Sequence, residues 1–435
     1  MWQPDVLVVG GGPAGVAAAV DLAGMGLSVL LAEQRDRLGG AIHRAYAGAG
    51  ASPIKRNAHH QRRWQGLLEQ VSQVGERLTL QLQSVFLGVE GNGRYLFDDR
   101  VAGRVRSVHP KAVVMAVGAV ERVLPVPGWE LPGVSTVGGM QVQLKETGEA
   151  PHGPILVAGS GPLPLAFAAQ LAAAGNPPLA LLERGTPFGS ALLQPGAALD
   201  GLRSWPQLAE ALGYARQLLR SGVPYRTGCA VMAIEEGPRG LRVAVLNRHG
   251  QTRVYEVAHL ALHDGLDANQ TGLPRQDASG LPVVWAGDCR EVLGADAAIS
   301  DGRQAAQQVA KALGHPCPDA SFDGPLYAAR RLQAALRTLY RAPAPAIPPA
   351  TVVCRCEGLR AASFATLQGA ASAHEMRVVG RFAMGTCQGR FCARNAQEFA
   401  ARSGVPFELT ELHGSTTRWP LRPVSVAALA AYTDE

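Results

Sequence analysis

The sequence of 435 residues predicts an α/β protein, and three observations carry that prediction. An apolar run, a glycine-rich turn, a stretch of small apolar residues and a second apolar run follow one another near the N-terminus. The same order recurs near residue 155, and four cysteines lie close together near the C-terminus. At about 150 residues per domain, the length allows roughly three domains. We therefore expect two strand–helix–strand domains and a small cysteine-bearing domain.

Composition and charge exclude several classes of protein. Hydrophobic residues make up 47% of the chain and charged residues 17%, so a disordered chain is not expected. The 51 glycines and 30 prolines argue against a coiled coil. The net charge of +6 is spread along the chain, so binding to nucleic acid is not indicated.

The apolar segment at residues 6–20 is not expected to enter a membrane or to direct export. It is shorter than the ~20 residues that a membrane helix needs, and it lacks the basic flank of a signal peptide. We expect a cytoplasmic protein, at the inner face of a membrane only through its partners. Its seven cysteines would then stay reduced.

The periodicity of apolar residues places the elements. The first unit is predicted as a strand at Asp5–Val9, a helix at Pro13–Met25 and a strand at Leu27–Ala32. The second unit is expected as a strand at Ile155–Ala158, a helix at Pro162–Ala174 and a strand at Leu179–Leu182. Three further elements are expected, namely buried strands at Val113–Val117 and Pro282–Ala286 and a helix at Ala295–Leu313.

The first turn carries the pattern G-x-G-x-x-G between the predicted strand and helix. Gly10 permits the tight turn, Gly12 lets the backbone approach a pyrophosphate, and Gly15 allows the helix to pack on the sheet. The phosphates would lie at the helix N-terminus. Glu33 lies 21 residues after Gly12, close to the spacing of a carboxylate that binds an adenosine ribose. The alternative is a glycine-rich turn with an exposed Glu33.

Residues around this turn resemble the FAD-binding half of flavoproteins related to glutathione reductase. Glu33-Gln34-Arg35 followed by Gly39-Gly40 carries the resemblance, with Gly287-Asp288 after a later strand. The resemblance implies that Asp288 accepts a hydrogen bond from a flavin ribityl hydroxyl, and that Ala116-Val117-Gly118 crosses between domains, with Val117 in place of the usual Thr. The implied FAD site comprises Gly10, Gly12, Pro13, Ala14, Gly15, Glu33, Gln34, Arg35, Gly39, Gly40, Val85, Ala116, Gly118, Gly287 and Asp288.

The second turn keeps two of the three glycines, and Pro164 takes the third position. Proline is tolerated in a first helical turn, because its missing N–H would be unpaired there. Glu183 favours an unphosphorylated ribose, whereas Arg184 leaves a 2′-phosphate open. ATP or NAD is the candidate ligand, and a fold kept only as a scaffold is the alternative. The expected contacts are Gly159, Gly161, Pro162, Leu163, Glu183 and Arg184.

Cys354, Cys356, Cys387 and Cys392 form the patterns C-x-C and C-x4-C. Four thiolates satisfy either a zinc ion or a [2Fe-2S] cluster, and cysteines without a metal are a third reading. We expect the cluster, because structural zinc usually takes a wider first spacing and a flavoprotein has a use for a one-electron centre. The other cysteines, which are Cys229, Cys289 and Cys317, are expected to be buried thiols.

The cysteine segment, Val353–Glu357 with Gly385–Cys392, resembles the [2Fe-2S] domain of the bacterioferritin-associated-ferredoxin type. The fold class expected is thus α/β, with two glutathione-reductase-like domains, the second inserted in the first, and a small α-rich [2Fe-2S] domain. The boundaries are 1–118 with 266–315 for the FAD domain, 119–265 for the second nucleotide domain, 316–350 for a linker, 351–414 for the [2Fe-2S] domain and 415–435 for a tail.

Taken together, these motifs resemble the α subunit, which carries FAD and [2Fe-2S], of heteromeric dye-linked amino-acid dehydrogenases. That group includes hydrogen cyanide synthase, nopaline and octopine oxidases, D-hydroxyproline dehydrogenase and archaeal L-proline dehydrogenase complexes. Further segments that carry the resemblance are Glu121–Pro125, Pro127–Trp129, Pro132–Val134 and Leu421–Pro423.

The resemblance implies a division of labour. A partner β subunit with its own FAD would oxidise the C–N bond of an amino acid, D-hydroxyproline or an opine. Electrons would pass through FMN at the subunit interface and the cluster to the FAD of this chain, and then to a quinone or dye-like acceptor. A small third subunit is a further candidate partner.

No catalytic base is evident from the sequence. The cysteine pair of disulfide reductases is missing after the first unit, and no hydrolase or H-E-x-x-H pattern occurs. His43 is the candidate for handling protons beside the flavin, and an ordinary core or surface histidine is the alternative. Two other functions stay open, namely a free-standing NAD(P)H-dependent reductase and a non-catalytic assembly or iron-handling protein.

Overall fold

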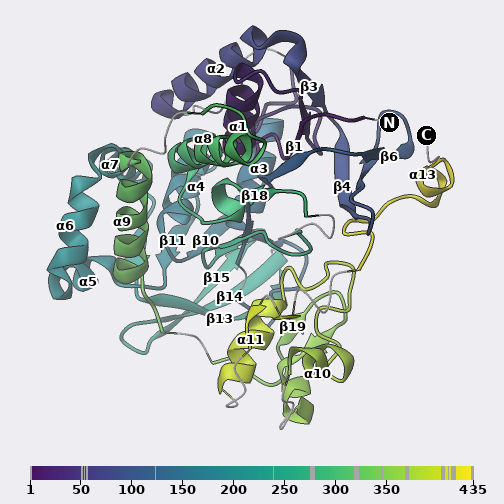
Figure 1. The fold of residues 1–435 in the computed structure, drawn as a ribbon. Helices are drawn as coiled ribbons and strands as arrows, with labels where there is room; N and C mark the ends of the chain where they lie inside the picture. Colours follow the sequence, from purple (N-terminus) through teal and green to yellow (C-terminus); the bar gives the residue numbers. More distant parts are fainter. Residues whose placement is uncertain are drawn as a thin grey trace.

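The computed structural model describes residues 2–49, 52, 54, 57–122, 124–238, 240–274, 280–317, 323–343, 346–367, 372–402, 407–409, 411–412 and 418–432. Val123, within one of the segments that carry the family resemblance, lies outside these residues. Two domains built on parallel sheets lie side by side (Figure 1). The described part of residues 351–414, which we call the cysteine-bearing segment, projects from them.

The first domain is built on a five-stranded parallel sheet. Its strand order is β18-β7-β1-β2-β3. The strands β1, β2 and β7 are buried along their whole length, as expected when both faces of a parallel sheet are covered. The bounds are β1 Val6–Val9, β2 Val29–Ala32, β3 Leu78–Gln81, β7 Ala112–Met115 and β18 Val283–Trp285.

Helices cover one face of this sheet and a small antiparallel sheet covers the other. Helices α1 and α8 approach closely, because a β-carbon on Gly302 would lie 2.1 Å from the carbonyl oxygen of Ala14. These elements are α1 (Pro13–Gly24), α2 (Ala58–Gln73), η1 (Gly75–Arg77), η2 (Gly287–Cys289), α8 (Ala295–Ala312), and the antiparallel strands β4 (Ser84–Val89), β5 (Tyr95–Asp99) and β6 (Arg104–Val108).

The second domain repeats this plan. Its parallel sheet has the order β12-β11-β10-β16-β9, and the antiparallel sheet β13-β14-β15 packs on one face. The strands are β9 Val134–Thr136, β10 Ile155–Gly159, β11 Ala180–Glu183, β12 Tyr225–Thr227, β13 Cys229–Gly237, β14 Gly240–Asn247, β15 Thr252–Val257 and β16 His259–His263. The helices are α3 (Val137–Thr147), α4 (Pro162–Ala173), α5 (Pro187–Leu193), α6 (Pro195–Arg203) and α7 (Trp205–Arg220).

An antiparallel pair of strands connects the two domains. Strand β8 (Ala119–Glu121) leaves the first domain and β17 (Leu266–Ala268) returns to it. The chain therefore completes its second domain between β7 and β18 of the first sheet.

The segment 316–350, expected as a linker, contains a helix of 16 residues, α9 (Gly324–Leu339). Asp323 caps it by accepting a hydrogen bond from the Leu326 amide, and Pro325 stands in the first turn. Leu326 and Ala335 are buried where α9 packs against α8 and α6. The helix is thus fixed by contacts with residues far away in the sequence.

The cysteine-bearing segment has its own core, in which the rings of Phe364 and Phe382 stack at 4.6 Å. A tail then leads back to the first domain, where the Leu421 amide donates to the Leu87 carbonyl and α13 packs beside β6. The elements are β19 (Val352–Cys354), β20 (Leu359–Arg360), η3 (Ala361–Leu367), α10 (Ala373–Val378), α11 (Ala393–Arg402) and α13 (Val426–Ala430).

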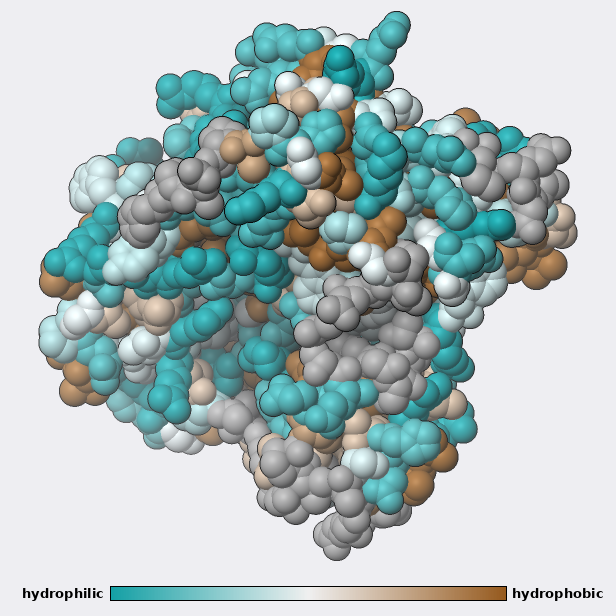
Figure 2. All heavy atoms as spheres, viewed as in Figure 1, coloured by the Kyte–Doolittle hydropathy of each residue, from teal (hydrophilic) through white to brown (hydrophobic). Residues whose placement is uncertain are grey.

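The surface bears a group of exposed apolar side chains on α5. Phe188 is 70% exposed, Leu192 86% and Leu193 80%. Figure 2 shows hydrophobic residues at the edge of the molecule where α5 lies in Figure 1. Within the described part of the chain, no helix is both long enough and apolar enough to pass through a bilayer.

Candidate functional site

The first glycine turn has the geometry that a dinucleotide requires. Gly10 has φ of 107°, and a β-carbon there would lie 2.4 Å from the Ala116 carbonyl oxygen. A β-carbon on Gly15 would lie even closer to the backbone, at 1.9 Å from the Gly10 carbonyl oxygen. Neither position therefore accepts a larger side chain. At Gly12 the nearest atom to a β-carbon would be the Gly40 α-carbon, at 3.8 Å. Open space therefore lies over the N-terminus of α1, which fits a pyrophosphate.

Glu33 is not the exposed residue of the alternative interpretation. Only 6% of it is exposed, and its carboxylate accepts hydrogen bonds from the Gly11 amide at 2.6 Å and the Arg35 amide at 2.9 Å. These two bonds hold the carboxylate at the end of β2 beside the glycine turn. Gln34 and Arg35 are exposed on the same rim.

Gly39 and Gly40 close a second loop onto the first. The Gly39 amide donates to the Gly11 carbonyl at 2.8 Å. Both glycines have positive φ, 133° and 60°, and a β-carbon on Gly40 would lie 3.2 Å from the Gly12 α-carbon. The two loops thus meet backbone to backbone, which only glycine permits at this distance.

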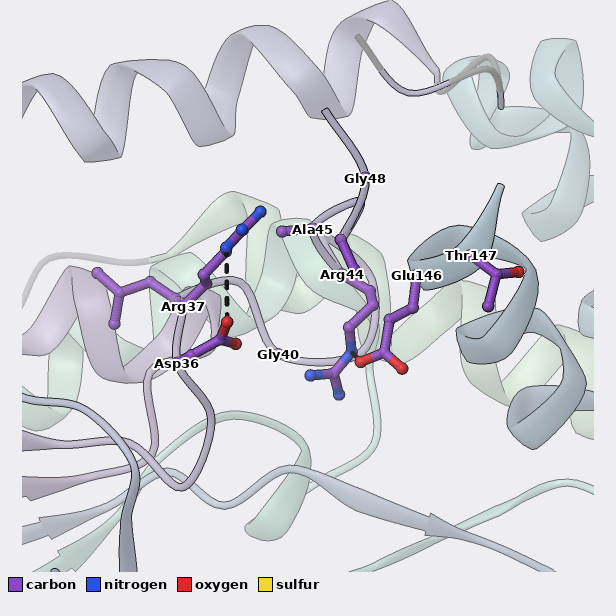
Figure 3. A pocket seen from close by; sticks show the side chains of 10 residues that line it. Asp36, Arg37, Gly40, Arg44, Ala45, Gly48, Glu146 and Thr147 are labelled. Carbon is purple, nitrogen blue, oxygen red and sulfur yellow. Dashed lines mark ion pairs between the residues drawn. The ribbon is translucent and has the colours of Figure 1, made fainter. Parts of the chain in front are cut away.

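A pocket of about 570 Å³ opens beside these loops (Figure 3). Arg44 lies in it next to Glu146 of α3, with Nε 3.5 Å from Oε1, and Asp36 and Arg37 form another wall. Burial lowers the pKa of the Arg44 guanidinium. Sequence reasoning missed Arg44 and Glu146, because nothing local connects residues about a hundred positions apart.

Gly287 and Asp288 follow β18 and lie beside the first turn of α1. Gly287 has φ of 68°, and a β-carbon there would lie 2.6 Å from the Ala14 β-carbon. Asp288 Oδ1 accepts hydrogen bonds from the Leu293 amide at 3.0 Å and the Gly294 amide at 3.2 Å. Burial raises the pKa of the Asp288 carboxyl group. The structure thus brings Asp288 to the N-terminal end of α1.

The remaining residues of the expected FAD site lie in β4, just after β7 and at the start of α1. Val85 is buried in β4, whose Ser84 amide donates to the Glu33 carbonyl at 2.8 Å. The Ala116 amide donates to the Val9 carbonyl at 2.8 Å, and Gly118, with φ of 74°, starts the crossing to the second domain. Pro13 and Ala14 open α1.

His43 is buried, with 4% of it exposed. Its ring stacks on Trp64 of α2, with the ring centres 4.9 Å apart and an angle of 7° between the planes. A surface histidine is therefore excluded. Its role with protons stays a prediction.

The second glycine turn reproduces the first in its main hydrogen bonds. Gly161 has φ of 105°, and its amide donates to Glu183 at 3.0 Å, while the Gly185 amide donates to the other carboxylate oxygen at 2.7 Å. A β-carbon on Gly159 would lie 2.0 Å from the His263 carbonyl oxygen. Burial raises the pKa of Glu183. Pro162 and Leu163 begin α4.

The four predicted ligand cysteines come together as two thiol pairs. A hydrogen bond with Cys392 lowers the pKa of Cys354 to about 7, and the thiols of Cys356 and Cys387 also interact. Gly385 makes room, because a β-carbon there would lie 2.3 Å from the Cys356 β-carbon.

Within the described residues, no three acidic, histidine or cysteine side chains are arranged to hold a metal ion together. The two thiol pairs nevertheless supply between them the four thiols that a [2Fe-2S] cluster takes as ligands. The residues therefore fit the group by their chemistry.

The cysteine-bearing segment is docked on the second domain and on the crossing between domains. The Trp129 indole N–H donates to the Val352 carbonyl at 2.6 Å, and the Arg355 guanidinium lies 3.8 Å from the centre of the Trp129 ring. Arg394 of α11 pairs with Asp267 of β17 at 3.0 Å. These contacts fix the thiol pairs next to the β8–β17 crossing.

The glycine turns and their carboxylates define a flavoprotein of the two-domain dinucleotide-binding class. Residues 4–290 match the family described as pyridine nucleotide-disulphide oxidoreductase, and the chain belongs to that family of flavin-dependent oxidoreductases. Membership implies that FAD binds.

Curated relatives match nearly the whole chain. An opine oxidase subunit of Rhizobium meliloti (strain 1021) is 32% identical over 99% of this chain and 98% of its own length. Hydrogen cyanide synthase subunit HcnB of Pseudomonas aeruginosa is 28% identical over 97% of each chain. The names of these relatives point to a subunit of a heteromeric flavin-dependent enzyme.

A solved structure shares the fold. L-proline dehydrogenase from P. horikoshii aligns with a TM-score of 0.61 and 18% identity, over 98% of this chain and 79% of the other. The two chains are therefore similar in architecture over almost the whole length of this protein.

Proposed function

We propose that this chain is the electron-transfer subunit of a heteromeric flavin-dependent dehydrogenase or oxidase that oxidises the C–N bond of an amino acid, D-hydroxyproline or an opine. The observation that carries the proposal is the pair of sites on one chain. A dinucleotide groove at Gly12 and Glu33 lies in the same molecule as two thiol pairs docked at the domain crossing. The relative named as an opine oxidase subunit supports the class of substrate.

The residues of this chain bind and orient the cofactors in this proposal. The N-terminus of α1 faces the pyrophosphate of FAD, Glu33 binds the adenosine ribose, and Asp288 orients the ribityl chain. Cys354, Cys356, Cys387 and Cys392 hold the cluster. Bound FAD supplies two-electron chemistry and the cluster supplies one-electron transfer.

A catalytic β subunit with its own FAD is the proposed partner, with FMN at the interface, a small third subunit and a quinone or dye-like acceptor. The exposed apolar side chains of α5 support a complex, because such groups mark protein–protein contacts. The proposal places the complex in the cytoplasm, at the inner face of a membrane when the acceptor is a quinone.

The test is purification of the complex from its native host, followed by identification of the associated chains. Amino acids or opines are expected to bleach the flavin of this chain only when the partner chain is present. An isolated chain that oxidises amino acids unaided would contradict the proposal. Rapid bleaching by NADH alone would favour the free-standing reductase, and colourless protein without flavin or iron would favour the assembly role.

A further inference from the structure

The chain lies across its own second nucleotide site. After α9 ends, the main chain at Tyr340–Pro343, which we call the strap, meets the second glycine turn. The Ser160 hydroxyl donates to the Tyr340 carbonyl at 3.0 Å, and the Arg184 guanidinium donates to the Pro343 carbonyl at 2.8 Å. Arg184 is one of the predicted nucleotide contacts and Ser160 lies in the second glycine turn, although the strap is 150 or more residues away in the sequence.

The strap lies at the adenosine end of the site. A β-carbon on Gly185 would lie 3.0 Å from the Tyr340 carbonyl oxygen, and the Gly185 amide binds Glu183. Glu183 is the carboxylate placed to bind a ribose. Burial and the nearby charge of Glu183 raise the pKa of the Tyr340 phenol to about 12, so this ring stays neutral beside the carboxylate. Tyr340 therefore lies beside the carboxylate to which a ribose would bind.

Arg184 is already engaged by the protein itself. Besides Pro343, it forms an ion pair with Asp264, whose side chain is only 7% exposed. A 2′-phosphate needs a free guanidinium at this position. It would also approach the carboxylate of Asp264, which repels it. The charges of the site thus favour a ribose with a free 2′-hydroxyl.

The strap is held in place by the packing of α9. Arg331 of α9 pairs with Asp200 of α6, and α9 contacts both α5 and α6 (Figure 1). Beyond the strap, the chain continues to β19 and the thiol pairs. The strap itself is half-buried to exposed, and the packing of α9 on one side of it limits where it can lie.

We infer that the strap and an adenine nucleotide compete for the second site, and that the site selects nucleotides without a 2′-phosphate. A nucleotide such as ADP-ribose binds only when Tyr340–Pro343 leaves Ser160 and Gly185. In the folded state the strap covers the ribose end of the site, whereas the space next to Gly161 is open. This inference concerns the second site alone and stands apart from the proposed relay of electrons through the first.

The test uses the full chain loaded with FAD and titrates ADP-ribose and 2′-phospho-ADP-ribose by calorimetry. Ser160→Ala removes one hydrogen bond to the strap, so ADP-ribose affinity should rise about fivefold. Tyr340→Ala should raise it further. Arg337→Ala, at an exposed position of α9, is the matched control and should bind like the wild type. Asp264→Asn should gain affinity for 2′-phospho-ADP-ribose relative to the wild type.

Hydrogen exchange provides a second readout that needs no activity. Bound ADP-ribose should speed exchange at the Tyr340 and Arg341 amides, which donate to Leu336 and Thr338 in the closed state. Equal affinities for ADP-ribose in the wild type, Ser160→Ala and Tyr340→Ala would overturn the inference. The inference would also be overturned if ADP-ribose bound without changing hydrogen exchange in the strap. It would be overturned as well if the wild type bound both ligands equally, or if no variant bound ADP-ribose.

Discussion

A β-carbon on Gly15 would lie 1.9 Å from the carbonyl oxygen of Gly10. The first turn of α1 thus rests directly on the end of the glycine turn, and this contact sets the position of the helix N-terminus. A β-carbon added to Gly24, at the other end of the same helix, would meet no heavy atom of another part of the chain within 4 Å.

Gly15→Ala should displace α1 from the turn and weaken FAD binding. Overpacking of this kind costs roughly 1–3 kcal/mol of unfolding free energy. The ratio of flavin to protein absorbance after purification and the midpoint of denaturant unfolding measure the two effects. Gly24→Ala is the control, and it should keep FAD and gain about 0.5–1 kcal/mol. Full FAD content in Gly15→Ala would show that the turn does not hold the cofactor.

Cys387→Ser should lose iron and the visible spectrum of a cluster while keeping FAD, because the thiol pairs and the glycine groove lie in separate parts of the fold. Iron analysis and flavin absorbance of anaerobically purified protein measure this. Cys317→Ser is the matched control, since the Cys317 thiol donates to the Gln307 carbonyl at 3.7 Å and packs against the core of the first domain. Loss of FAD together with iron would refute the separation of the sites.

Trp129→Phe should loosen the cysteine-bearing segment without unfolding the second domain. The variant keeps a buried ring but loses the hydrogen bond to the Val352 carbonyl, worth about 1 kcal/mol. Hydrogen exchange in Val352–Cys354 should become faster. Trp205→Phe, at a position that is 64% exposed, should leave this exchange unchanged. Unchanged exchange in Trp129→Phe would show that other contacts alone dock the segment.

His60 should make the stability of the protein depend on pH. Asp296 and Glu210 raise the pKa of His60 from 6.5 to about 9, and Arg63 also pairs with Asp296. Because the folded-state pKa is the higher one, the stabilisation is complete below about pH 6.5 and is lost as the pH rises through 9. After screening by solvent it should amount to about 1 kcal/mol.

Denaturant unfolding of wild type and His60→Gln at about pH 6 and about pH 9.5 tests this dependence. The two proteins should differ at the lower pH and converge at the higher pH. His152→Gln, at an exposed position, is the control and should follow the wild type throughout. An equal difference at both pH values would mean that the charge of His60 contributes nothing.

Much of the first site could be predicted from the sequence. The strand expected at Asp5–Val9 is found at Val6–Val9, and the helix expected at Pro13–Met25 at Pro13–Gly24. The second unit behaves in the same way, with β10 and α4 at the expected positions. These elements depend on backbone conformation and apolar spacing within a short stretch of chain, which the sequence displays directly.

The helix α9 was not predicted, although its N-terminal signal, Asp323 followed by Pro325, is present. Its sequence is rich in alanine and arginine, and its buried side chains are covered by α6 and α8. Likewise, nothing in the sequence relates Arg44 to Glu146, or Trp129 to Val352. Such pairs depend on how whole elements pack, and that packing is set by many weak contacts at once.

The sequence by itself determined the two glycine turns, the carboxylates that follow them and the grouping of four cysteines, because each is a local pattern with a local conformational requirement. Only the tertiary structure decided that the cysteines form two pairs, that Arg44 faces Glu146 and that Tyr340 lies against Ser160. Those relationships join residues distant in the chain, and only the packing of the folded domains brings them within contact distance.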